Sequence, residues 1–297
     1  MTRTDPEDPA PGIDPGHYLA EVLQILEQRA LDRAQVDWAR FRQVPVASLD
    51  DAHTVITRAV EALGNKHTFF LTPQAAEERR TRGSAQENPL PSGRMLEERF
   101  AYLDLPSVAG SPEFNRHYTA AGAALIRGLD VHDPDGWIID LRGNGGGNMY
   151  PMLTVVAPLL DDGHLGSFLD ADGSETSRWE LHDGEILHQE SSRSPVPNPY
   201  TLRRPRPRTA LLTGPSTASA AEATLISFLG LPDVRTFGEP TGGYATSNEC
   251  IDLPDGARLV LTCSREADRL GRVYDNIPIP PDEHGQDALA LALAWLR

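Results

Sequence analysis

In the second half of the chain, short apolar strands alternate with helices, and two of the strands run directly into loops of very small residues. The strand predicted at 137–141 leads into Arg142-Gly143-Asn144-Gly145-Gly146-Gly147. The strand predicted at 209–213 leads through Gly214-Pro215-Ser216-Thr217-Ala218 into an apolar helix that opens at Ser219. Alternating strands and helices predict an α/β fold, in which loops at strand ends carry the functional residues. These two transitions therefore constrain the fold and the site together.

The chain is predicted to divide into three stretches. Residues 1–73 form an N-terminal helical subdomain, in which Asp14-Pro15 opens one helix and Ser48 with Asp51 caps a second. Residues 74–98 are polar and interrupted by glycine and proline, which predicts a linker. Residues 99–297 form the α/β core, with an insertion of hairpins and a proline-rich segment at about 161–208.

Composition excludes several classes of partner. The formal net charge is −16 and the pI is near 4.9, so neither nucleic acid nor an anionic membrane is an expected partner, because both need clustered Lys and Arg. The proline-rich start has no apolar run like that of a signal peptide, which predicts a cytoplasmic location. Cys250 and Cys263 are expected to be reduced thiols without a catalytic role. Composition leaves a homo-oligomer open.

Ser219 allows two interpretations. A serine at a helix amino terminus lies beside free N–H groups and the positive end of the helix dipole, which suit a nucleophile whose reaction develops negative charge. The pattern Ser219-x-x-Glu222 also fits a capping box, in which the serine is structural. The three consecutive glycines 145–147 favour a loop whose N–H groups approach an anion.

Five motifs in order resemble the C-terminal processing (tail-specific) serine peptidases, in the tricorn-core-like and nisin-resistance-protein-like branch that lacks a PDZ domain. They are Leu63-Gly64-Asn65-Lys66-His67-Thr68, Ile139-Asp140-Leu141-Arg142-Gly143-Asn144-Gly145-Gly146-Gly147, Thr217-Ala218-Ser219-Ala220-Ala221-Glu222, Gly238-Glu239-Pro240-Thr241-Gly242-Gly243 and Asp268-Arg269-Leu270-Gly271-Arg272-Val273-Tyr274. The resemblance implies a ClpP/crotonase-like core of ββα units. It implies no metal and no organic cofactor.

The same resemblance assigns the catalytic roles. Ser219 is the expected nucleophile and His67 its general base, and the amides of Ala220 and of Gly145 or Gly146 are expected to form the oxyanion hole. The tail-specific enzymes use a lysine base where this chain has Tyr244.

The choice of base also follows from composition. Lys66 is the sole lysine of the chain, whereas an imidazole ordinarily titrates near pH ~6.5. Activity is therefore expected to rise as His67 deprotonates near that pH.

A carboxylate is expected to hold His67 in one tautomer. Asp275 aligns with the carboxylate that has this role in the tricorn-like branch. Glu222 and Glu239 are alternatives, although Glu222 fits a capping partner and Glu239 fits a residue that supports the adjoining turn.

The sequence thus predicts a serine peptidase that acts through an acyl-enzyme on peptides or small acyl substrates. Without a PDZ domain, recognition would rest on the cleft itself, which favours dedicated substrates. The alternatives are a non-catalytic lipid- or peptide-binding protein of the same fold, a biosynthetic acyl-transfer or cyclisation enzyme, and a crotonase-like acyl-CoA enzyme. The last is the weaker because the chain lacks a basic cluster for the phosphates of coenzyme A.

Overall fold

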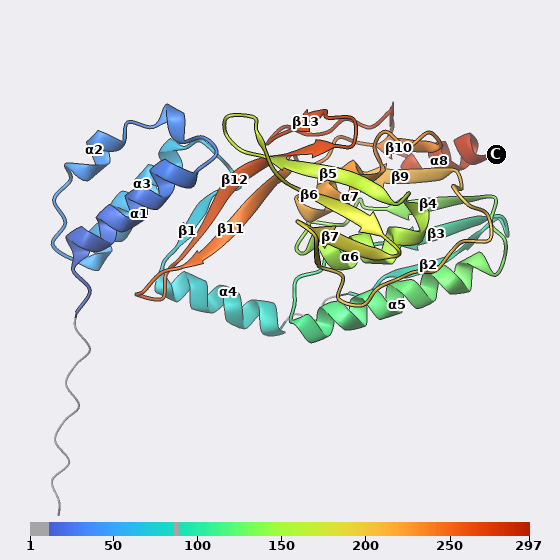
Figure 1. Ribbon diagram of the computed structural model, residues 1–297, viewed down its shortest axis with the longest axis horizontal. Coiled ribbons are helices and arrows are strands. Elements are labelled where there is room, and N and C mark those ends of the chain that lie inside the picture. Colours follow the sequence, from blue (N-terminus) through green and yellow to red (C-terminus); the bar gives the residue numbers. More distant parts are fainter. Residues whose placement is uncertain (1–11, 86–88) are drawn as a thin grey trace, which may run out of the picture. The chain divides into compact units, whose positions relative to one another are not determined.

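The structure, a computed structural model, describes residues 12–85 and 89–297 (Figure 1). The acidic start up to residue 11 and residues 86–88 of the predicted linker lie outside this range. The chain forms two compact units. Of the described residues, the first unit comprises those up to Arg80 together with Asn248–Cys263, and the second comprises those of Thr81–Ser247 together with Ser264–Arg297.

The first unit is mainly helical, as the sequence predicts. Its elements are α1 (Pro15–Arg29), η1 (Arg33–Gln35), α2 (Trp38–Arg42), α3 (Leu49–Ala62), β1 (Phe69–Leu71), most of α4 (Pro73–Ala85), most of β11 (Thr246–Asp252) and the first half of β12 (Arg258–Asp268). The side chain of Asp14 accepts a hydrogen bond from the His17 N–H at 2.7 Å and caps α1. Ser48 and Asp51 form the predicted capping box of α3.

A hairpin from late in the sequence completes the core of this unit. β1 pairs antiparallel with β12, and β11 pairs with β12 as well. Leu253, Leu259 and Leu261 from this hairpin join the buried faces of α1 and α3 in one apolar cluster. Helices with one apolar face need such a partner to bury it. The sequence predicts the hairpin but places it in the α/β core, so this part of the domain division is wrong.

The second unit is built on a six-stranded sheet in the order β14-β10-β9-β4-β3-β2. Its strands are β2 (Ser92–Leu96), β3 (Phe100–Asp104), β4 (Gly136–Asp140), β9 (Thr209–Thr213), β10 (Val234–Gly238) and β14 (Glu283–His284). All neighbours are parallel except β2, which pairs antiparallel with β3 at the edge. The carboxyl ends of the parallel strands β4 and β9 therefore lie at the same edge of the sheet, where both small-residue loops begin.

Helices cover both faces of this sheet, and alternating residues of each strand pack against one face or the other (Figure 1). Ile138 of β4 and Leu212 of β9 pack against α8 (Ala288–Leu296). Trp137 and Ile139 belong instead to the larger cluster that contains α5 (Pro112–Asp130), α6 (Met149–Val156) and α7 (Ala220–Phe228). Successive side chains of a strand point to opposite faces, which accounts for this division.

Strands of a second, antiparallel sheet pack on the far side of α6 and α7. They are β5 (Gly163–Leu169), β6 (Glu175–His182), β7 (Glu185–His188), β8 (Ser191–Ser192), the end of β12 and β13 (Val273–Tyr274). Trp179 of β6 is fully buried, and its Nε1 donates to Ser227 Oγ of α7 at 2.9 Å. The predicted α/β class and the hairpin turns at Asp172-Gly173 and Asp183-Gly184 are confirmed.

The predicted linker at 74–98 contains regular structure. α4 begins at Pro73, and β2 follows at Ser92. The sequence of α4 has almost no apolar period, and its pair Arg80–Glu77 is of the i,i+3 kind that supports an exposed helix. A helix without an amphipathic pattern is invisible to a search for periodicity.

Candidate active site

Ser219 lies between β9 and α7. β9 ends at Thr213, and small residues lead from there to Ser219, which precedes the first residue of α7. The backbone of Ser219 has φ 54° and ψ −122°, a region that residues with a side chain rarely adopt. A capping serine ordinarily has an extended backbone, so capping alone does not require this conformation. Strain of this kind is typical of functional residues, including nucleophiles held between a strand and a helix.

Glu222 connects the nucleophile turn to a second loop. Its carboxylate is fully buried and accepts the N–H of Ser219 at 2.9 Å, the hydroxyl of Thr241 at 2.5 Å, and the N–H groups of Gly243 at 3.0 Å and Tyr244 at 2.6 Å. Burial raises the pKa of Glu222, and these four hydrogen bonds partly offset that rise. The capping role predicted for Glu222 is confirmed.

The strand end before the glycine loop is fixed by ion pairing. Asp140 of β4 is 5% exposed and accepts the Tyr102 hydroxyl at 2.6 Å and the Arg142 guanidinium at 2.5 Å. Burial alone would raise the pKa of Asp140, but the hydrogen bonds from Arg142 and Tyr102 outweigh it and hold the pKa below its ordinary value. The ionised Asp140 therefore fixes the position at which the glycine loop begins.

The glycine loop lies directly against Ser219. Gly146 has φ +98°, and a Cβ there would lie 2.7 Å from the carbonyl oxygen of Ala218, 2.9 Å from Ser219 Cβ and 3.0 Å from the Ala220 nitrogen. Only glycine allows this approach. Gly145 is farther away, since the nearest atom to its Cβ position is Ser107 Oγ at 3.8 Å.

The amides predicted for the oxyanion hole differ in what they already bind. The Gly145 N–H donates to Ser107 Oγ at 2.8 Å, and the Gly146 N–H donates to Asn144 Oδ1 at 2.9 Å. The Ala220 N–H has no acceptor within the described residues. Ala220 is therefore the best-placed donor of the three, and Gly146 is the glycine nearest to it.

His67 belongs to the first unit. Its N–H donates to Asn65 Oδ1 at 2.9 Å, and its carbonyl oxygen accepts the side chain of Asn248 at 3.3 Å. Burial lowers the pKa of His67 to about 4, and the ammonium of Lys66 contributes to the decrease. The value of ~6.5 expected from the sequence is therefore replaced by a lower one, and the imidazole is neutral at physiological pH.

The remaining candidate carboxylates belong to the second unit. Asp275 forms an ion pair with Arg265 at 2.7 Å. Glu239 is exposed, and its carbonyl oxygen accepts the hydroxyl of Thr213 at 2.9 Å. Glu222 is occupied by its four donors. The role of Asp275 as the carboxylate that orients His67 stays a prediction, as does the pairing of His67 with Ser219.

A further buried carboxyl group, Glu266 of β12, was not predicted from the sequence. It is 3% exposed, and its Oε2 has no hydrogen-bond partner among the described residues. Its N–H donates to the carbonyl oxygen of Ala245 at 3.4 Å. Burial raises the pKa of Glu266 well above its ordinary value, and repulsion from Glu222 adds to the rise. Glu266 therefore favours its protonated, uncharged form in the core of the second unit.

A family model supplies the decisive comparison. Residues 99–284 match the model of peptidase family S41. The chain belongs to peptidase family S41. The match begins just before β3 and ends at β14, so it covers every strand of the six-stranded sheet except the edge strand β2, together with both small-residue loops and α7.

Curated relatives agree with this assignment. The chain is 28% identical to a nisin-resistance protein of Lactococcus lactis subsp. lactis over 289 residues, which covers 95% of this chain and 87% of that protein. It is 23% identical to the chloroplastic carboxyl-terminal-processing peptidase 2 of Arabidopsis thaliana, over 57% of this chain and 30% of that protein. The resemblance predicted from the five motifs is confirmed.

Solved structures of other proteins share the fold. A lipoprotein from Streptococcus agalactiae superposes with a TM-score of 0.81 at 29% identity, covering 98% of both chains. The photosystem II D1 C-terminal processing protease gives a TM-score of 0.67 at 15% identity, covering 93% of this chain and 94% of that one. The fold is thus the mixed α/β fold of family S41, with N-terminal helices and a ClpP/crotonase-like core sheet, as predicted.

Asn144 is the site residue that sequence reasoning missed. It is 1% exposed, its Nδ2 donates to the carbonyl oxygen of Leu105 at 2.7 Å, and its own carbonyl oxygen accepts the Ala218 N–H at 3.0 Å. It therefore joins the end of β3, the glycine loop and the nucleophile turn. Its position between Gly143 and Gly145 was the available signal, because a polar residue inside a glycine run needs partners once it is buried.

Within residues 12–85 and 89–297, no three His, Cys, Asp or Glu side chains come together as metal ligands would. No helix in the described part of the chain has the length and apolar character needed to cross a membrane. The cytoplasmic location stays a prediction.

Proposed function

We propose that this member of family S41 is a serine peptidase that hydrolyses peptide bonds through an acyl-enzyme on Ser219. In the first step Ser219 Oγ attacks the acyl carbon, its proton passes to His67, and the carbonyl oxygen becomes an oxyanion. Protonated His67 then gives the proton to the leaving amine as the carbon–nitrogen bond breaks. Water, activated by His67, hydrolyses the ester and restores both residues.

One observation carries the proposal. Ser219 has a strained backbone at the amino terminus of α7, and Gly146 is so close that no side chain would fit between them. Backbone strain of this kind costs about 1–3 kcal/mol. A serine that only capped the helix would have no reason to keep this strained conformation. The arrangement instead presents the side chain beside N–H donors, as acyl transfer requires.

The oxyanion donors follow from the same geometry. The Ala220 N–H leads the set because it has no acceptor among the described residues. Gly146 would contribute its N–H by sharing it between Asn144 Oδ1 and the oxyanion. Each donor of this kind typically contributes about 10²- to 10³-fold to kcat.

His67 is proposed as the base because its pKa of about 4 keeps it neutral and able to accept a proton at physiological pH. Tyr244 occupies the place of the lysine that the tail-specific enzymes use, and Lys66 is the sole lysine of the chain. A Ser–His pair is therefore favoured over a Ser–Lys pair.

Labelling with a fluorophosphonate tests the nucleophile. The reagent should modify Ser219, and peptide mapping by mass spectrometry should locate the adduct. Ser216 is an exposed serine of the same turn, so Ser216→Ala is the matched control and should label normally, whereas Ser219→Ala should not. An adduct on another serine, or no adduct under conditions that label a known serine hydrolase, would contradict the proposal.

The substrate class is proposed as peptides with a dedicated role. One relative is named for resistance to nisin, and a dedicated target agrees with the absence of a PDZ domain between the His67 segment and the core. A cytoplasmic location is proposed from the sequence. One protein with the same fold is a lipoprotein, so cell fractionation should test the location, and recovery in the membrane fraction would contradict the proposal.

A further inference from the structure

The second unit contains a pocket of about 310 Å³ at the end of α6. η2 (Ala157–Leu159) and the residues up to Asp162 form one wall, the Asp183-Gly184 turn between β6 and β7 forms another, and the proline-rich segment closes the pocket from Asn198 to Arg206. Pockets that bind small ligands or side chains begin at about 300 Å³. The volume of this pocket is therefore large enough to hold a small ligand or a side chain.

Asn198 holds two walls of this pocket together. Its N–H donates to the carbonyl oxygen of Gly184 at 2.9 Å, and its Nδ2 donates to the carbonyl oxygens of Thr154 at 3.1 Å and Val155 at 3.2 Å. Gly184 fits so closely that a Cβ there would lie 2.3 Å from the carbonyl carbon of Asn198. Asn198 is 2% exposed and lines the pocket, yet its Oδ1 has no partner among the described residues. That oxygen is itself closed to solvent, so Asn198 serves the pocket by joining its walls.

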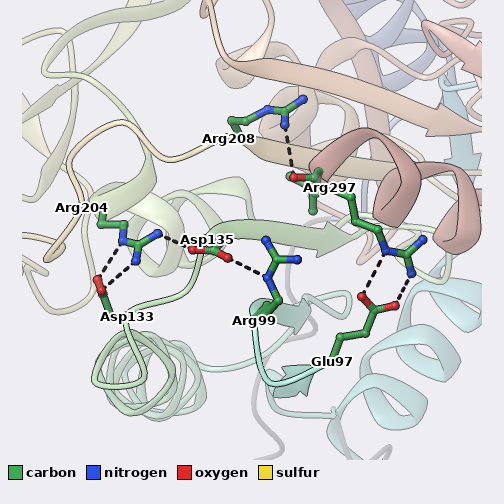
Figure 2. A network of polar contacts seen from close by, with 8 residues as sticks. Glu97, Arg99, Asp133, Asp135, Arg204, Arg208 and Arg297 are labelled. Atoms are coloured by element: carbon green, nitrogen blue, oxygen red, sulfur yellow. Dashed lines mark hydrogen bonds and ion pairs between the residues drawn. The ribbon is translucent and has the colours of Figure 1, made fainter.

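The proline-rich wall is also fixed beyond Asn198. The hydroxyl of Tyr200 and the N–H of Arg203 both donate to Asp130 Oδ2, at 2.8 Å and 3.0 Å. Figure 2 shows Arg204 between Asp133 and Asp135, with two bonds to the first and one to the second. Exposed ion pairs are individually weak, but several on one short segment hold it in a single conformation. The wall is thus formed before any ligand arrives.

The pocket carries an excess of negative charge. Asp161, Asp162 and Asp183 line it, against one cation, Arg206, which pairs with Asp161 at 2.9 Å. Asp162 accepts the N–H of Asp183 at 3.3 Å. Within the described residues no cation pairs with the carboxylate of Asp183.

Apolar side chains form much of the remaining lining. Leu181 and Leu202 are 2% and 5% exposed, and Pro158 and Pro199 add rigid apolar surface. The lining therefore combines an apolar floor with an acidic rim. Lysine matches both features, because it has an apolar stem and a positively charged head with three N–H donors.

We infer that this pocket is a binding site for a lysine-bearing segment of a peptide, with the stem against the leucines and prolines and the ammonium at Asp183. The inference goes beyond the proposed hydrolysis, since binding here needs neither Ser219 nor His67. In a peptidase, such a site would retain a basic segment of the substrate apart from the bond that is cleaved.

The test is a binding measurement on the full chain with Ser219→Ala, which prevents turnover. The probe is acetyl-Ala-Lys-Leu-Lys-amide, followed through the backbone amide resonances of the protein. The same peptide with norleucine in place of both lysines keeps the stems and removes the charges. Saturable shifts are expected at residues 157–162 and 198–204, with clearly weaker binding of the norleucine peptide and weaker binding at high salt.

Two variants locate the charge. Asp183 has φ 49°, which Asn tolerates well, so Asp183→Asn should keep the turn and weaken binding by about threefold to tenfold. Glu190 is an exposed acid at φ 64° in the next turn, and Glu190→Gln is the matched control that should leave the Kd unchanged. The inference is overturned by an unchanged Kd in Asp183→Asn, by equal binding of the norleucine peptide, or by no saturable shift at millimolar peptide.

Discussion

Replacing Ser219 by glycine should abolish activity and yet give a more stable protein than replacing it by alanine. The reason is the backbone of Ser219, with φ 54° and ψ −122°, which glycine adopts without the steric penalty of a side chain. Alanine keeps the penalty. The two substitutions remove the same hydroxyl, so the difference between them isolates the strain.

The size of the difference can be worked out from three contributions. Relief of the strain contributes about 1–3 kcal/mol in favour of glycine. Glycine tolerates the cap position better than alanine by roughly 0.5 kcal/mol or more. The greater freedom of glycine in the unfolded chain subtracts about 0.4–1 kcal/mol. Ser219→Gly should therefore exceed Ser219→Ala by about 0.5–3 kcal/mol in the free energy of unfolding.

Urea unfolding followed by tryptophan fluorescence measures this difference, since Trp137 and Trp179 are buried in the core of the second unit. Ser216 supplies the control, because it lies in the same turn without a positive φ. There the order should reverse, with Ser216→Ala more stable than Ser216→Gly. If Ser219→Gly is no more stable than Ser219→Ala, Ser219 is not strained and the main support for its role as nucleophile is lost.

Three further predictions concern the loop, the base and the buried acid. Gly146→Ala should lower kcat by about 100-fold or more because its Cβ would displace Ser219 and Ala220, whereas Gly143→Ala, with nothing within 4 Å of its Cβ, should keep most of the activity; equal effects in steady-state assays would contradict the proposed packing. The acidic limb of kcat/KM should lie near pH 4, since only neutral His67 accepts a proton and its pKa is about 4. Lys66→Ala should move the limb to higher pH. A limb near pH 6.5 would contradict the lowered pKa, and a limb that persists in His67→Ala would contradict His67 as the base. Because the folded-state pKa of Glu266 is raised, its contribution to stability is present at low pH and is lost by about 1.4 kcal/mol per pH unit between its unfolded and folded pKa values. Glu266→Gln should remove that slope from urea unfolding measured against pH, and an unchanged slope would show that Glu266 is not its source.

Features encoded in neighbouring residues were predicted well from the sequence. The cap of α1 and the capping box of α3 depend on residues three positions apart, and both form. The loops after β4 and β9 were also recognisable, because runs of glycine and other small residues at a strand end have few alternative uses.

Features that depend on distant partners were not predictable in this way. The hairpin after Asn248 joins the helical unit because α1 and α3 have apolar faces to cover, and no local pattern says which face a hairpin covers. The sequence predicts that Gly145 or Gly146 donates to the oxyanion, but it does not show that Ser107, 38 residues earlier in the chain, accepts the Gly145 N–H. The sequence around Glu266 indicates only that it lies in a strand, and its burial depends on the packing of other elements around it. In each case the deciding contact is tertiary.

The hydrogen bonds of Glu222 tie position 244 to the nucleophile turn. One carboxylate holds the backbone of Ser219 and, through the Tyr244 N–H, the backbone at the place where the tail-specific enzymes have lysine. The main chain at that place is thus fixed by the nucleophile turn itself, whichever side chain it bears. A substitution at position 244 should therefore change the side chain that this loop presents while the backbone of the nucleophile turn stays in place.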